Sequence, residues 1–156
     1  MAGKESRAGQ LAQRYFREEH NCAMAVLRAV SETEGLGCDA CVPGMALAMG
    51  GGLGHTGHAC GALTGGVMAI GLAVDRFTSG PLAEKKDEAY LLAAGLVNHF
   101  CDAQGAANCA VLLGFNWTDP GAKQRWHQEG RDKCLNYVAW TADETVRIVE
   151  TLRGRK

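Results

Sequence analysis

The segment from Gly50 to Val74 constrains the fold more than any other part of the chain. It begins with Gly50-Gly51-Gly52-Leu53-Gly54, a run with too many glycines to hold a helix, which therefore predicts a loop. The stretch Ala59–Val74 that follows is apolar enough to form a buried helix. Glycines recur along it and would let neighbouring backbones approach closely, at Gly61, Gly65, Gly66 and Gly71. The core is therefore expected to form around this one helix.

The N-terminal part of the chain also has helical periodicity. Between Ser6 and Ser31, apolar residues recur at helical spacings, at Leu11, Tyr15, Cys22, Val26 and Val30. Asn21 is expected to interrupt this pattern and to cap a second helix that starts at Cys22. After a connector at residues 34–39, Pro43 would occupy the first turn of a short helix that runs through Met49.

The second half of the chain is expected to be helical as well. Pro81 should start a helix that reaches about Phe100, and Asn108 should cap a short helix that begins at Cys109. Two helices are expected within residues 120–152. The break between them is placed near Thr141, because Thr141-Ala142-Asp143-Glu144 has the pattern of a capping box.

Together these patterns predict an all-α fold. Isoleucine occurs only at Ile70 and Ile148, and valine is mostly isolated, so the alternation typical of strands is missing. The expected architecture is one compact domain over residues 1–156, a bundle of about six or seven helices. Residues 1–5 and 153–156 are expected to fray at its ends.

Charge and hydropathy exclude several classes of partner. A net charge of −1, from 16 basic and 17 acidic residues, argues against nucleic acid and anionic lipid. Residues 1–21 are polar, unlike a secretory signal, and no apolar run reaches the roughly 18 residues of a membrane helix. We therefore expect a soluble cytoplasmic protein without membrane insertion. In that reducing compartment, seven cysteines point to metal binding or redox chemistry rather than to disulfides.

Three of the cysteines stand where helices are expected to begin. Cys60 directly precedes the apolar helix, and Asn21-Cys22 and Asn108-Cys109 each place a cysteine after a capping asparagine. The N-terminus of a helix has unpaired backbone N–H groups and favours negative charge. The thiol of Cys60 is therefore expected to be biased toward the thiolate, the form that binds metals and attacks disulfides.

Four cysteines form the candidate site: Cys22, Cys60, Cys109 and Cys134. If they converge, four thiolates suit an iron–sulfur cluster or a closed tetrahedral zinc site. Without metal, the same residues could act in thiol–disulfide exchange, with Cys60 as the attacking thiolate and Cys22 as its neighbour. The alternative is four buried small residues without shared chemistry, and the spacing leaves both interpretations open.

The remaining cysteines carry weaker signals. Cys38-Asp39-Ala40-Cys41 is a CxxC motif, but no βαβ pattern surrounds it, no second CxxC exists, and no histidine follows it. These absences argue against a thioredoxin-like dithiol, a zinc knuckle and a c-type haem attachment site. A surface disulfide, functional or accidental, stays open, and Cys101 is expected to serve in packing.

Other chemistry-bearing residues lie around Cys60. Gly52-Leu53-Gly54-His55-Thr56-Gly57 satisfies GxGxxG, but dinucleotide binding needs a preceding strand, and the sequence provides none. His55 and His58 could ligate metal or donate protons, although solvated loop histidines are the simpler interpretation. The tryptophans are expected in the core or an interface, at Trp117, Trp126 and Trp140.

The run Cys60-Gly61-Ala62-Leu63-Thr64-Gly65 resembles the CGAxxG signature of the C_GCAxxG_C_C family of small redox-active proteins. That family has four invariant cysteines: one before the signature, one within it and two after it. Asn21-Cys22-Ala23 is similar to the first element, Asn108-Cys109 to the third, and Cys134 to the fourth. The resemblance covers about residues 15–146 and assigns no role to Cys38, Cys41 or Cys101.

This resemblance implies a redox-active protein in which Cys22, Cys60, Cys109 and Cys134 hold an iron–sulfur cluster, for example [2Fe–2S]. Such a protein would pass single electrons to a redox partner protein, as an electron carrier or as an oxidoreductase. Related domains occur in split-Soret cytochromes c beside haem, but no haem attachment motif stands here. The alternatives are a metal-free thiol–disulfide oxidoreductase and a structural zinc-binding interaction module. Glycine-faced helices would also allow a homodimer.

Overall fold

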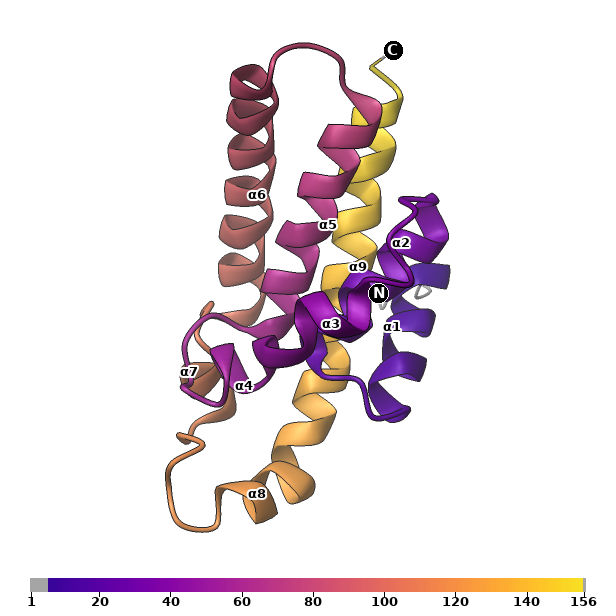
Figure 1. Ribbon diagram of the computed structural model, residues 1–156. Helices are drawn as coiled ribbons and strands as arrows, with labels where there is room; N and C mark the ends of the chain where they lie inside the picture. The colour runs from indigo at the N-terminus through magenta and orange to yellow at the C-terminus, as the bar shows by residue number, and fades with distance from the viewer. Residues whose placement is uncertain (1–5, 156) are drawn as a thin grey trace.

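The computed structural model describes residues 6–155, and it confirms the predicted all-α fold (Figure 1). Five longer helices build the bundle: α1 (Arg7–Arg17), α2 (Cys22–Glu34), α5 (Gly61–Phe77), α6 (Leu82–Gln104) and α9 (Arg131–Arg153). Short elements connect them: α3 (Val42–Ala46), a 3₁₀ turn (Leu47–Met49), α4 (Gly50–Leu53), α7 (Cys109–Leu113), α8 (Ala122–Arg125) and a π-helical turn (Trp126–Gly130). Residues 6–155 contain no strand, so the sheet that dinucleotide binding requires is absent.

Helices α2, α5 and α9 pack against one another and form the centre of the bundle. Helix α1 covers α2 and α9, and α6 covers α5 and α9. Figure 1 shows α5, α6 and α9 running side by side, with α7 and α8 beyond the end at which α5 begins. The largest fully buried apolar side chains are Phe100, Leu27, Ile70, Leu96, Val26 and Val30.

The glycines of α5 determine how closely its neighbours approach. A Cβ atom added at Gly61 would lie 3.0 Å from the Cβ of Cys22, and one at Gly65 would lie 2.6 Å from the carbonyl oxygen of Ala23. Farther along, a Cβ at Gly66 would meet the side chains of α6 and α9 at 2.8 Å. The CGAxxG glycines therefore hold the first turns of α2 and α5 in direct contact, which brings Cys22 close to Cys60.

The predicted start of α2 is confirmed. The side-chain oxygen of Asn21 accepts a hydrogen bond from the backbone N–H of Met24 at 2.9 Å, and the helix begins at Cys22. The predicted start of α7 at Cys109 is also confirmed, and Asn108 holds the N-cap position, but its side chain makes no capping hydrogen bond. In the glycine run, Gly51 and Gly52 have φ angles of 63° and 74°, so this segment turns tightly and is not regular helix.

The predicted break near Thr141 is wrong. Helix α9 runs without interruption from Arg131 to Arg153, and Thr141 is fully buried within it. Asp143 of the presumed capping box bonds to another helix, α1, because its carboxylate accepts a hydrogen bond from the backbone N–H of Gly9 at 2.6 Å. A local capping pattern therefore marked a tertiary contact between α9 and the start of α1.

The C-terminal end of α9 is held in place. The guanidinium of Arg153 donates to the carbonyl oxygen of Glu34 at 2.7 Å, so the predicted fraying does not extend to residue 153. The next described residues are also held, since Arg155 pairs with Glu88 at 3.1 Å. The predictions for residues 1–5 and 156 lie outside the described residues. Among the helices of residues 6–155, none combines the length and the apolar character needed to cross a membrane.

Candidate functional site

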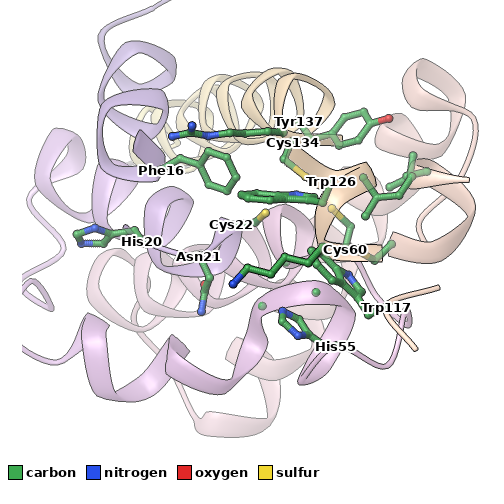
Figure 2. Close-up of a pocket in the computed structure, with 18 of the residues that line it drawn as sticks. Phe16, His20, Asn21, Cys22, His55, Cys60, Trp117, Trp126, Cys134 and Tyr137 are labelled. Carbon is green, nitrogen blue, oxygen red and sulfur yellow. The ribbon is translucent and has the colours of Figure 1, made fainter. Parts of the chain in front are cut away.

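All four candidate cysteines line one cavity of about 610 Å³. Cys22 is the first residue of α2, Cys60 directly precedes α5, Cys109 is the first residue of α7, and Cys134 lies in the first turn of α9. Figure 2 shows the sulfurs of Cys22, Cys60 and Cys134 directed into the same space. Three helix starts and one position inside the helical segment 122–153, far apart in sequence, thus place their thiols around one cavity.

Backbone hydrogen bonds join the segments that carry Cys60 and Cys109. The N–H of Cys60 donates to the carbonyl oxygen of Ala107 at 2.8 Å, and the N–H of Cys109 donates to that of His58 at 2.7 Å. The glycine loop closes over the same place, because a Cβ added at Gly52 would lie 2.7 Å from the Cβ of Cys109. Since Gly52 also has a positive φ, only glycine suits this position.

Cys22 and Cys134 form a hydrogen-bonded pair. A hydrogen bond from the Cys22 thiol to the Cys134 sulfur raises the pKa of Cys22 well above its usual value and lowers the pKa of Cys134. The indole N–H of Trp126 and the ammonium group of Lys133 lower the pKa of Cys134 further, against the effect of burial. The thiolate of this pair therefore belongs to Cys134.

The thiolate bias expected at Cys60 is wrong for the metal-free protein. Cys60 is 4% exposed, and burial raises its pKa to about 12. The backbone N–H groups of Ala62 and Leu63 donate to the sulfur and lower the pKa, as expected at a helix start, but their effect is smaller. Burial likewise raises the pKa of Cys109, and the indole N–H of Trp117 opposes it.

These pKa directions predict an order of reactivity in the metal-free protein. With a pKa of about 12, about one Cys60 in ten thousand is ionised at pH 8, so its alkylation should be slow and should rise steeply with pH. Cys134 should react at lower pH. Timed iodoacetamide labelling followed by peptide mass spectrometry measures both rates, with the exposed Cys41 as an internal reference. Equal rates for Cys60 and Cys134 at pH 8 would contradict the assignment.

Two tryptophans belong to the site rather than to the core alone. Trp117 and Trp126 line the cavity, whereas Trp140 packs against Phe100 with ring centroids 5.5 Å apart. The Nε1–H of Trp117 is buried beside the sulfur of Cys109 and lowers the pKa of that thiol. The sequence offers no signal for this difference, because aromatic residues are common in both settings.

The histidines near Cys60 have different positions. His55 lines the cavity and stacks on Trp117, with ring centroids 4.3 Å apart and an interplanar angle of 9° (Figure 2). His58 is exposed and does not line the cavity, although its carbonyl oxygen accepts from Cys109. Of the two, only His55 faces the site.

The other three cysteines lie outside this cavity. Cys38 is buried, Cys41 is exposed, and the N–H of Cys41 donates to the carbonyl oxygen of Cys38 at 2.9 Å in a tight turn. Cys101 is half-buried on α6. All seven cysteines are in the described part of the chain, and none of them forms a disulfide there.

The cysteines surround a space and do not converge on a single point. Within residues 6–155, no three His, Cys, Asp or Glu side chains are arranged to hold one metal ion. A structural zinc site needs four ligands at about 2.3 Å from one centre, a geometry that these side chains do not have as they stand. The rest of the lining is mostly apolar and aromatic.

Comparison with known proteins gives a family for this arrangement. The sequence profile described as "Putative redox-active protein (C_GCAxxG_C_C)" matches residues 20–148, a range that contains all four cysteines of the cavity. The chain belongs to this family. A protein of Archaeoglobus fulgidus described as "Uncharacterized protein" is 31% identical over 135 residues, covering 83% of this chain and 84% of that protein. No solved structure matches the chain.

The structure shows what the glycines and cysteines of the C_GCAxxG_C_C pattern do. Gly61 and Gly65 of the signature bring α5 against α2 at Cys22, and the last two cysteines of the pattern close the cavity from α7 and α9. The family's description concerns redox activity, and the four thiols of the pattern line one cavity.

Proposed function

We propose that this protein is an electron carrier in which Cys22, Cys60, Cys109 and Cys134 hold an iron–sulfur cluster. One observation carries the proposal: four thiols from four helices line a single cavity. A bound cluster would supply one-electron transfer at this position. Thiolate ligation from dispersed cysteines is a common way to hold such a group.

The shape and the hydrogen-bonding groups of the cavity fit a cluster better than a single ion. Because a multi-iron cluster extends over several atoms, its ligands stand around a space, as the cysteines do here. The buried Nε1–H of Trp117 interacts with the sulfur of Cys109 and lowers the pKa of that thiol. It could donate to a ligating thiolate, and such hydrogen bonds to sulfur are among the factors that determine a cluster's reduction potential.

The surroundings of each cysteine determine the pH at which its thiol loses the proton and can bind iron. A ligating cysteine must lose its proton, and burial raises the pKa of Cys60 to about 12. Loading should therefore displace a proton from Cys60 and weaken as pH falls. The N–H groups of Ala62 and Leu63 are already placed to donate to that sulfur once it is a ligand.

Anaerobic reconstitution with ferrous iron and sulfide tests the proposal. We expect a brown protein with visible absorption between about 320 and 550 nm, and iron and sulfide in a fixed ratio to protein, as thiolate-ligated clusters show. A colourless protein that retains no iron after desalting would overturn it. Zinc in stoichiometric amount without a redox response would favour the structural alternative instead.

The hydrogen-bonded pair supports a second candidate function, thiol–disulfide exchange. Because the pKa of Cys134 is lowered and that of Cys22 is raised, Cys134 is the better attacking thiolate, in place of Cys60. Cys134 would attack a substrate disulfide and release one thiol. Cys22 would then displace the second thiol, leaving the substrate reduced and a Cys22–Cys134 disulfide. Mapping of that disulfide in metal-free protein after treatment with oxidised glutathione distinguishes this function from the first.

A further inference from the structure

The cavity lining has a buried part and an exposed part. Cys60, Cys109 and Cys134 are buried, whereas three cationic side chains on three different elements line the exposed part, here called the opening: Arg17 near the end of α1, Lys123 in α8 and Arg131 at the start of α9. All three are exposed. In the part of the chain that the structure describes, none of them lies within ion-pair distance of a carboxylate, so their charges are available to a ligand.

The charge around the opening is positive on balance. Glu19 is the one carboxylate among the residues that line the cavity in residues 6–155, against the three cations. The neighbouring Arg125 is already paired with Glu129 at 3.3 Å and does not line the cavity. Clefts of one sign with low-dielectric walls concentrate ligands of the opposite sign. The opening therefore favours anions.

The volume leaves room for a ligand beside the cysteines. A cavity of about 610 Å³ is within the range of small-molecule sites, about 300–1,000 Å³. A [2Fe–2S] core has only four atoms and would fill a small part of it. Aromatic side chains also line the cavity, where Figure 2 shows Trp126 near the sulfurs and Trp117 beside His55. Flat apolar molecules pack well against such rings.

We infer that this opening binds a small organic anion with a flat aromatic body. The anionic group would pair with Arg17, Lys123 and Arg131, and the ring would lie against Trp117 and Trp126. This inference deepens the proposed function, because a molecule seated there would be next to the cysteines and would be the electron-transfer partner of the centre they hold. Its binding, however, requires the cavity alone and not a cluster.

Two dyes that share one ring system test the inference. 8-Anilinonaphthalene-1-sulfonate carries a negative charge, and N-phenyl-1-naphthylamine is the same molecule without the sulfonate. We expect the anionic dye to bind metal-free protein at one site. Arg17→Glu, Lys123→Glu and Arg131→Glu should each weaken its binding by about fivefold to tenfold. The affinity of the neutral dye should fall by less than about twofold in each variant. Added salt should weaken the binding of the anionic dye only.

Lys86→Glu on α6 is the matched control, because Lys86 is exposed, has the same charge and lies outside the cavity. Its dye affinities should equal those of the original protein. Equal affinity of the anionic dye in all four variants would overturn the inference, as would an equal loss for both dyes. Equilibrium dialysis of iron-loaded protein repeats the measurement. Failure to load iron would count against the cluster and leave the dye result intact.

Discussion

Cys60→Ser should lose nearly all of its iron after anaerobic reconstitution, with the visible absorption falling in proportion. The variant removes the least exposed of the four proposed ligands. Changes in the groups that merely orient ligands cost about 10–100-fold in metal affinity, so loss of a ligand should cost at least about 100-fold. Iron and sulfide determination after desalting measures the effect.

Cys101→Ser is the matched control for this experiment. Cys101 is also a free thiol, half-buried where Cys60 is buried, but it lies on α6 outside the cavity. The control should load as much iron as the original protein. Because serine in place of a buried cysteine can destabilise the fold, urea unfolding of both variants accompanies the iron determination. Full iron loading of a folded Cys60→Ser variant would contradict the assignment of Cys60 as a ligand.

The part of the site that depends on local sequence could be predicted. Helix starts have local signals, so the sequence placed Cys22, Cys60 and Cys109 at the N-termini of helices, and the structure places them there. The glycines of α5 also predicted close approach, which the contacts of Gly61, Gly65 and Gly66 confirm. The prediction is wrong for Gly71, because nothing lies within 4 Å of a Cβ added there. The convergence of the four thiols was only a hypothesis at that stage, because it depends on how the helices pack.

The features that could not be predicted are long-range. The pKa of Cys60 follows burial by several elements, and this outweighs the local effect of the helix start that the sequence revealed. Similarly, the break placed near Thr141 followed a local pattern whose acid in fact bonds to α1. The cations at the cavity opening come from α1, α8 and α9, and no spacing in the sequence indicates that they meet.

Gly65→Ala should destabilise the fold, although alanine favours a helix. The new Cβ would lie 2.6 Å from the carbonyl oxygen and 3.0 Å from the Cα of Ala23, and backbone cannot rotate away as a side chain can. Overpacking of this kind costs about 3 kcal/mol, the upper part of the usual range. The higher helix propensity of alanine relative to glycine offsets about 1 kcal/mol of this cost. We therefore expect a net loss of about 2 kcal/mol in the free energy of unfolding, measured by urea denaturation.

Gly71→Ala on the same helix separates packing from propensity. Nothing lies within 4 Å of a Cβ at Gly71, so this variant should gain stability, by up to about 1 kcal/mol. A second readout concerns the site itself. Because Gly65 holds α5 against α2 beside Cys22, separation of these helices should also speed the alkylation of Cys22, whereas Gly71→Ala should leave it unchanged. Equal stability and equal Cys22 labelling in the two variants would show that the close contact of α2 and α5 does not hold the cysteines together.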